Sequence, residues 1–274
     1  MKLDSHQHFW QIDRGDYAWM SPGLTALYRD FMPHDLEPEM RAAGVSESIV
    51  VQAAATLAES RFLLDIAQQC DFVVGVVGWV DMASPKAAHD LAALSESRWL
   101  KGIRPMIEFI ADPDWMLGSQ VAGALEALAD QQLCFDAVIK PIHLPRLLHV
   151  AGAHPKLRIV IDHGAKPDIA RGAFHPWSEQ IAGIARFPNV FCKLSGLLTE
   201  ASPGATLETL EPYMQHLLDC FGIDRLVWGS DWPVMNLASN YLSWSHMCER
   251  FLEPLDGRAQ EAILSRNARE CYRL

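Results

Sequence analysis

Two histidines separated by one residue, His6 and His8, stand at the end of a short β-rich run near the start of the chain. Side chains at positions i and i+2 of a strand point the same way, so both imidazoles can reach one point. A lone histidine is more often an ordinary polar residue, and His-x-His alone is a weak motif. His163 and Asp231 follow two later β-rich runs, and together with His6 and His8 they favour a functional site. Three imidazoles and a carboxylate suit hydrolysis, in which they activate water or hold one Zn²⁺.

Eight short β-rich runs are available to position these side chains. The predicted strands are Lys2–His6, Ser48–Gln52, Phe72–Val80, Leu100–Ile103, Leu133–Asp136, Arg158–Asp162, Val190–Lys193 and Leu226–Gly229. Several are almost continuously apolar, which is typical of parallel strands buried on both faces. Eight strands that alternate with helices close naturally into a barrel. The sequence therefore predicts an α/β fold, a (β/α)8 TIM barrel in which residues 1–274 form a single domain.

Helical patterns separate the predicted strands. The predicted helices are Asp35–Ala43, Glu59–Cys70, Pro85–Ser97, Ser119–Gln131, Leu144–His154, Pro176–Arg186, Thr206–Phe221 and Gly257–Tyr272. Gly44 is expected just after the first helix, and Ser84 is expected to cap the third. The stretch Phe9–Met32 has no clear periodicity, so it is predicted as a large loop after the first strand. Such loops lie over the active site of a barrel.

Other polar residues also end predicted strands, where barrels place their active sites. Arg104 suits the recognition of substrate oxygens, because its planar guanidinium can donate two parallel hydrogen bonds. A structural ion pair is an equally good interpretation of an arginine taken alone. Asp136 can orient Arg104 or bind a substrate hydroxyl. Lys193 invites a substrate-binding role too, unless its side chain points outward into the helix layer.

Two tryptophans adjoin the predicted catalytic strands. Trp10 follows the first strand and Trp232 follows the last. Aromatic faces beside hydrogen-bond donors suit sugar-like substrates, which have apolar C–H faces and hydroxyl edges. The competing interpretation is that these side chains only cap the barrel core. We therefore treat both as candidate substrate-binding residues.

Ordered motifs from end to end resemble the amidohydrolase superfamily, in its amidohydrolase-2 branch. The resemblance rests on Asp4-x-His6-x-His8-Phe9-Trp10, Asp162-His163, Gly229-Ser230-Asp231-Trp232-Pro233 and the closing Asn267-Ala268-x-x-x-Tyr272. Further motifs are similar to a lactonase group that includes L-fuconolactonase, L-rhamnonolactonase and pyrone-dicarboxylate lactonase. These are Val51-Gln52-Ala53, Lys101-Gly102-Ile103-Arg104, Phe135-Asp136 and Asn189-Val190-x-Cys192-Lys193-Leu194-Ser195-Gly196.

The resemblance implies an activity and a role for each matched residue. The expected enzyme opens the ring of a sugar-acid lactone, L-fucono- or L-rhamnonolactone for example, in carbohydrate catabolism. Asp231 would be the general base toward water. His6, His8 and His163 would bind a metal or polarise the carbonyl directly. Arg104 would hold substrate oxygens.

The metal content is a separate expectation. Related lactonases work without an essential metal, so no essential cofactor is the first expectation. A single divalent ion such as Zn²⁺, held by His6, His8, His163 and Asp231, stays open. Metal-dependent members of the superfamily commonly add a histidine on strand five, where this chain has Asp136. A binuclear centre is therefore not expected, although Lys101 leaves room for one.

Three other functions stay open at this point: a metal-dependent decarboxylase of an aromatic acid, hydrolysis of another cyclic ester, and a non-catalytic ligand-binding barrel. A net charge of −11 and an isoelectric point near 5.4 argue against a nucleic-acid partner. The chain has no apolar run of the ~18 residues that a membrane span needs, and its first residues do not form a signal peptide. Six scattered cysteines suggest no disulfide framework. A cytoplasmic enzyme with a small-molecule substrate is expected, and a homo-oligomer stays open.

Overall fold

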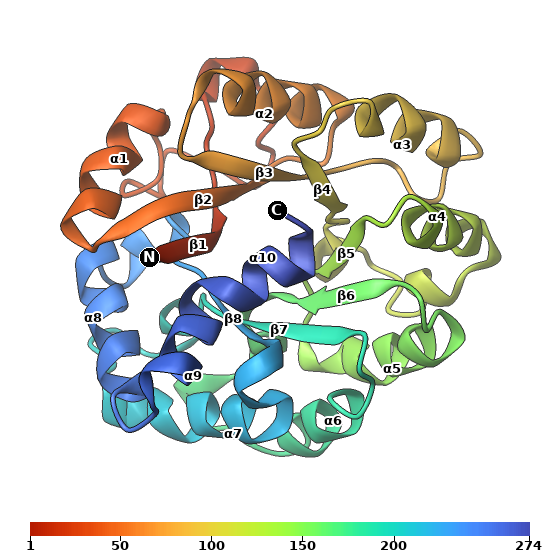
Figure 1. The fold of residues 1–274 in the computed structure, drawn as a ribbon. Coiled ribbons are helices and arrows are strands. Elements are labelled where there is room, and N and C mark those ends of the chain that lie inside the picture. Colours follow the sequence, from red (N-terminus) through yellow and green to blue (C-terminus); the bar gives the residue numbers. More distant parts are fainter.

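Eight parallel strands lie side by side in chain order in the computed structural model, which describes residues 1–274 (Figure 1). Their bounds are β1 (Lys2–Gln7), β2 (Val45–Val51), β3 (Val73–Gly78), β4 (Leu100–Ile103), β5 (Cys134–Ala137), β6 (Arg158–Ile161), β7 (Val190–Leu194) and β8 (Leu226–Trp228). Each overlaps a predicted strand, so the (β/α)8 barrel is confirmed. The carboxyl ends of parallel strands share one rim, which is where barrels place their chemistry.

The seam between the last and first strands is made just beyond the end of β8. The backbone N–H of Asp231 donates to the carbonyl of His6 at 2.7 Å, and that of His8 donates to Trp232 at 2.7 Å. Because β8 itself has three residues, these two bonds carry much of the closure. They also fix the backbone of Asp231 beside His6 and His8.

Helices surround the barrel. They are α1 (Pro33–Ala42), α2 (Leu57–Gln69), α3 (Ala87–Ser95), α4 (Ser119–Asp130), α5 (Leu144–Ala153), α6 (Trp177–Ile184), α7 (Leu207–Arg225) and α8 (Tyr241–Leu252). Gly44 has the left-handed φ of 68° expected of a residue that follows a helix. Ser84 lies before the start of α3, and its hydroxyl accepts a hydrogen bond from Lys86 N at 3.1 Å. No helix is both long and apolar enough to cross a lipid bilayer.

The helix α8 was missed in the sequence. Its cap is Asn240, whose side chain accepts a hydrogen bond from Ser243 N at 2.9 Å. Aromatic residues such as Tyr241 and Trp244 have modest helix propensity and obscure the pattern. Both are buried in the structure, where they pack against the barrel. Tertiary packing therefore stabilises this helix more than its intrinsic propensity does.

The last predicted helix, Gly257–Tyr272, does not join the ring, so its assignment as the eighth outer helix was wrong. It divides into α9 (Gly257–Glu261), a π-helical turn (Ala262–Arg266) and α10 (Asn267–Tyr272). Figure 1 shows α10 lying across the amino-terminal end of the barrel, with the C-terminus near its centre. Tyr272 belongs there to a buried cluster with apolar side chains of the barrel interior, among them Val51 and Val227. The final helix is thus a plug for the barrel floor.

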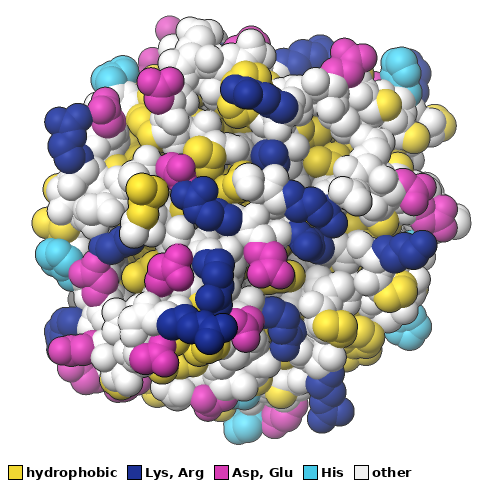
Figure 2. Space-filling model, viewed as in Figure 1, with side chains coloured by type: hydrophobic (Ala, Val, Ile, Leu, Met, Phe, Trp, Pro, Cys, Tyr) yellow, Lys and Arg dark blue, Asp and Glu magenta, His cyan; other side chains and the backbone are white.

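Basic side chains surround this plug (Figure 2). Arg158 donates to the carbonyl of Cys271 at 2.8 Å, and Lys101 donates to that of Arg273 at 3.4 Å. Cations near the end of a helix offset the partial negative charge of its last carbonyls. Lys101 therefore lies at the floor of the barrel and cannot contribute to a metal site at the opposite rim.

Candidate active site

One carboxylate lies among three imidazoles at the carboxyl-terminal rim of the barrel. Asp231 Oδ1 lies 3.3 Å from His8 Nε2, 3.7 Å from His6 Nε2 and 3.8 Å from His163 Nε2. The Nε2 atoms of His6 and His8 are 3.2 Å apart. All four side chains are almost completely buried. The structure thus brings together the four residues that the sequence nominated.

Hydrogen bonds on the far side of two rings turn their Nε2 atoms toward Asp231. His8 Nδ1 lies 2.8 Å from the carbonyl of Val51, which requires a proton on Nδ1 and leaves Nε2 with a lone pair. His163 Nδ1 lies 2.8 Å from the hydroxyl of Ser195. Gly196 leaves room for this ring, because a Cβ at that position would lie 2.4 Å from His163 Nδ1.

A buried hydrogen-bond cluster holds the strained turn that carries Asp231. The φ of Asp231 is 62°, a left-handed conformation that residues with a Cβ rarely adopt. Asp4 accepts hydrogen bonds from Ser230 N at 2.8 Å, Ser230 Oγ at 2.6 Å and the Tyr241 hydroxyl at 3.0 Å. Burial raises the pKa of Asp4 to about 6, and these donors oppose the rise. Asp4 of β1 therefore ties down the turn after β8, one residue before Asp231.

The pKa values favour an ionised Asp231 among neutral imidazoles. Burial by itself would raise the pKa of Asp231, but His163 and the other two rings outweigh it and hold that pKa below its ordinary value. Burial lowers the pKa of His8 and His163, and burial with the nearby Lys193 ammonium lowers that of His6 well below its usual range. Near neutral pH the carboxylate of Asp231 can therefore accept a proton.

A layer of buried charges lies under His6. Lys193 Nζ donates to Asp136 Oδ2 at 2.7 Å and lies 3.0 Å from both Asp162 Oδ1 and His6 Nδ1. The Tyr272 hydroxyl of the floor plug donates to Asp136 Oδ2 at 2.6 Å. Asp136 and Lys193 are completely buried and do not line the pocket described below. The side chain of Lys193 points into the barrel. Asp136 and Lys193, which were predicted to bind substrate, therefore lie one layer below the rim.

Arg104 spans this layer and the pocket. Its Nη1 lies 3.2 Å from Asp162 Oδ2 and 3.2 Å from His6 Nε2. Its Nη2 donates to Gln52 Oε1 at 3.0 Å and to the Gln52 carbonyl. The guanidinium is therefore fixed in orientation beside the carboxylate–imidazole cluster, and it lines the pocket.

The two predicted tryptophans are buried beside the site and do not line the pocket. Trp10 packs edge-on against Phe31 and Trp19, with ring centroids 5.3 and 5.6 Å away. Trp232 also packs edge-on against Phe31, at 5.2 Å. Together they hold the loop after β1 against the rim, and the side chain that this loop gives to the pocket is Trp19.

A pocket of about 140 Å³ opens above the cluster. Twelve residues line it: His8, Trp19, Ala53, Arg104, Met106, Glu108, Phe109, Val138, His163, Lys166, Asp231 and Val234. Sequence reasoning missed Glu108 and Lys166 as site residues. Both lie several residues beyond a strand end, where the rule that polar strand ends face the mouth no longer applies.

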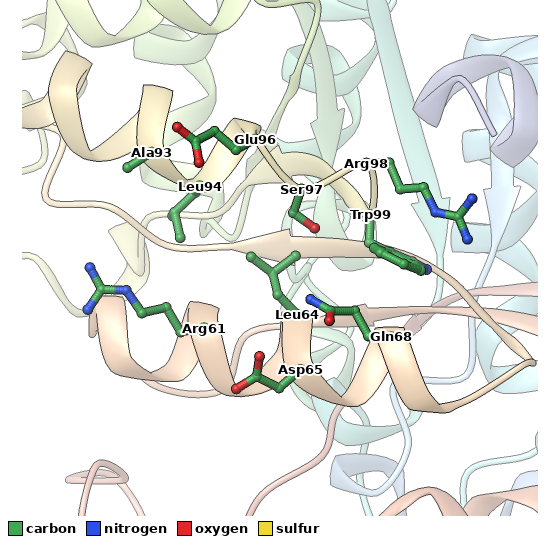
Figure 3. A pocket seen from close by; sticks show the side chains of 10 residues that line it. All are labelled: Arg61, Leu64, Asp65, Gln68, Ala93, Leu94, Glu96, Ser97, Arg98 and Trp99. Carbon is green, nitrogen blue, oxygen red and sulfur yellow. The ribbon is translucent and has the colours of Figure 1, made fainter.

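A larger hollow of about 570 Å³ lies on the outside of the barrel, between α2 and α3 (Figure 3). Leu64, Gln68 and Trp99 are among the side chains that line it. None of the residues of the carboxylate–imidazole cluster contributes to it. The smaller pocket at the rim, which the carboxylate–imidazole cluster lines, is therefore the candidate active site.

The predicted loop over the rim, residues 9–32, is confirmed, and the carboxylate of Glu59 fastens it. Glu59 lies in the first turn of α2, where it accepts hydrogen bonds from Ala53 N at 3.1 Å and from the Tyr17 hydroxyl at 2.9 Å. Arg14 reaches the same carboxylate at 3.4 Å. Trp19 donates to the Ala53 carbonyl at 2.7 Å, so this latch positions one wall of the pocket.

The Glu59 latch gives a pH-dependent stability. Burial raises the pKa of Glu59 from 4.5 to about 7, so the fold favours its protonated form. Its contribution is fully present below about pH 4.5 and is lost as the pH rises through 7. We expect the free energy of unfolding to fall by about 3 kcal/mol from this group between pH 5 and pH 8. Urea unfolding of the wild type and of Glu59→Gln at both pH values isolates the contribution of Glu59 to the free energy of unfolding. A decrease of equal size in the variant would assign the pH dependence to other groups.

The rim cluster has the geometry of a site for a single ion. One donor atom each from His6, His163 and Asp231 lies within 4.8 Å of the others, and His8 Nε2 adjoins them. Metal–ligand distances of about 2.0–2.1 Å in a tetrahedral zinc site separate the ligands by roughly 3.4 Å. Asp136 is already paired with Lys193, which leaves a second ion without the ligand expected on strand five.

Comparisons with known proteins find relatives that align with the whole chain. The sequence profile of the amidohydrolase family matches residues 3–274. An L-fucono-1,5-lactonase of Burkholderia ambifaria is 45% identical over 280 residues, which cover 100% of this chain and 96% of that protein. An L-fucono-1,5-lactonase of Burkholderia multivorans is 33% identical over 292 residues, with 100% and 96% covered. The crystal structure of a Burkholderia multivorans amidohydrolase with bound zinc has a TM-score of 0.95 at 34% identity, with 100% and 99% covered.

Proposed function

The chain belongs to the amidohydrolase family, and we propose that it is a lactonase that hydrolyses a sugar-acid lactone, with L-fucono-1,5-lactone as the first substrate to test. The observation that carries the proposal is the Asp231 carboxylate that lies 3.3–3.8 Å from three buried imidazoles beside a pocket. Two relatives with this activity in their names align with the whole chain, which supports the same substrate class.

In the proposed reaction, Asp231 acts as the general base. Its carboxylate accepts a proton from a water molecule as the water oxygen bonds to the lactone carbonyl carbon. The ring C–O bond then breaks, and the proton returns from Asp231 to the ring oxygen to give the open hydroxy acid. His6, His8 and His163 orient the water and the carboxylate.

Arg104 is proposed to stabilise the oxyanion that forms at the carbonyl. Asp162 and Gln52 hold its guanidinium in place before the substrate arrives, which is the preorganisation that oxyanion stabilisation requires. Asp136 and Lys193 support His6 from below, while Trp10 and Trp232 support the rim from the side. We therefore propose positioning roles for these four residues.

The same residues fit a single divalent ion. His6, His163 and Asp231, with His8 beside them, would hold it. A bound ion would polarise the carbonyl as a Lewis acid and lower the pKa of a water molecule. The cytoplasmic setting and the oligomeric state stay predictions.

Proton release from a panel of 1,4- and 1,5-aldonolactones tests the proposal, before and after treatment with a chelator. We expect turnover of 1,5-lactones that carry several hydroxyl groups. Metal analysis of the same samples shows whether the ion is present and whether turnover depends on it. Hydroxybenzoates form the second arm, because a decarboxylase on this barrel would release CO₂. Release of CO₂ with no lactone turnover would overturn the lactonase proposal.

A further inference from the structure

Four consecutive residues after β6 form a left-handed turn. The φ angles are 54° at His163, 58° at Gly164, 62° at Ala165 and 51° at Lys166. The turn is closed by a hydrogen bond of 2.9 Å from Lys166 N to the His163 carbonyl. Three of these residues carry a Cβ, for which this conformation is unfavourable. Strain of this kind persists where the surrounding structure enforces it, often at functional sites.

The turn brings two side chains into the same pocket. His163 and Lys166 are three residues apart, and both line the cavity above Asp231. Trp177 Nε1 holds the middle of the turn by donating to the Gly164 carbonyl at 2.7 Å. A right-handed turn would direct Lys166 elsewhere. The strained backbone therefore places an ammonium group beside the reaction centre.

The ammonium of Lys166 is only partly satisfied by the protein. Lys166 Nζ lies 3.0 Å from Glu108 Oε1 and 2.9 Å from Glu108 Oε2. Glu200 Oε1 lies 3.7 Å away, beyond a normal hydrogen bond. An ammonium has three protons to donate, and a carboxylate can accept about four hydrogen bonds. Lys166 and Glu108 both line the pocket, and each can form further hydrogen bonds.

We propose that Lys166 and Glu108 form a subsite for the hydroxyl groups of the lactone ring. A hydroxyl donates one hydrogen bond and accepts others, so adjacent hydroxyls match a carboxylate that lies beside an ammonium. Phe109, the next residue after Glu108, lines the pocket although it is 62% exposed, and it offers an apolar surface to the C–H face of the ring. The inference rests on the proposed function for the identity of the ligand. It predicts that the enzyme selects polyhydroxylated lactones over unsubstituted ones.

A purely structural ion pair accounts less well for this arrangement. The side chains of Lys166 and Glu108 are only 19% and 8% exposed, so the cost of removing both charges from water offsets much of their mutual attraction. The ion pair by itself therefore does not account for the strain of a left-handed turn of four residues. Substrate binding does account for it, since the positions of the two charged groups must match the ring.

Calorimetric binding of L-fucono-1,5-lactam, a ring amide far less reactive than the lactone, tests the subsite. We expect Lys166→Met to weaken binding by about 10- to 100-fold, because a hydrogen bond to a charged group is lost. Glu108→Gln should weaken it in the same direction. Lys140→Met is the matched control, since Lys140 is an exposed lysine on the loop after β5 and does not line the pocket. It should bind the lactam as the wild type does.

Turnover provides a second measurement. Lys166→Met should raise KM for the hydroxylated lactone and leave kcat/KM for δ-valerolactone, which has no hydroxyl groups, within about threefold of the wild type. Unchanged lactam binding in both Lys166→Met and Glu108→Gln overturns the subsite, as does an equal loss for both lactones. If the wild type binds the lactam through Lys166 but hydrolyses no lactone, the subsite stands and the proposed function fails.

Discussion

Asp231→Asn is expected to lower kcat for lactone hydrolysis by about 10²- to 10⁴-fold, the range that a positioned general base contributes. The amide has the shape of the carboxylate but cannot accept the proton of the attacking water. Asp231 N is bonded to His6 O, so the variant should keep the closed seam and the pocket. Steady-state kinetics with the best lactone of the panel give kcat and KM, and calorimetry with the lactam shows that binding persists.

Asp168→Asn is the control for this prediction. Asp168 follows the same strand as His163, but its side chain is exposed and pairs with Arg171. It should leave kcat unchanged. Should Asp231→Asn retain more than a tenth of wild-type kcat, the proton acceptor is another group.

Lys193→Met is expected to destabilise the fold by about 3–5 kcal/mol, the usual result of removing one partner from a buried charge pair. Asp136 and Asp162 would stay buried without the ammonium that now lies 2.7 and 3.0 Å from them. Burial already raises the pKa of Asp136, and Lys193 opposes that rise, so the variant should recover part of its stability in acid. Urea unfolding at pH 5 and pH 7.5 measures both effects.

A second substitution separates loss of charge balance from loss of packing. Lys193→Met combined with Asp136→Asn removes one charge of each sign, and it should be more stable than the single variant. Lys140→Met, which changes an exposed lysine in the same way, should unfold as the wild type does. A single variant as stable as the wild type would show that the buried charges do not hold the barrel together.

Periodicity was sufficient to predict the barrel but not the role of every helix. Strands such as β3 are short and almost entirely apolar, so their burial is visible in the sequence. The helix α8 was missed because its buried aromatic residues mask the helical pattern. Gly257–Tyr272 was predicted as a helix, and it is largely helical, but its place across the floor depends on contacts with β1 and β8. Long-range packing of this kind leaves no local signal.

The rule that polar strand ends face the mouth predicted that His6, His8, His163 and Asp231 lie together, as they do, but it does not separate the rim from the layer below. His8, His163 and Asp231 follow the last residues of their strands and reach the pocket. Asp136 and Lys193 lie within β5 and β7, so their side chains occupy the layer below. The rule could not predict that Lys166 lines the pocket, because Lys166 lies beyond the strand end and a left-handed turn brings it back.

The floor plug has a consequence for substitutions far from the pocket. The Tyr272 hydroxyl donates to Asp136, Lys193 donates to the same carboxylate, and Lys193 lies beside His6, so one continuous chain of polar contacts joins the floor to the rim cluster. A residue that never meets a ligand can therefore affect the orientation of one that lies beside Asp231, as outer partners of a functional side chain generally do. In this sense the floor helix is a structural support for the opposite end of the barrel.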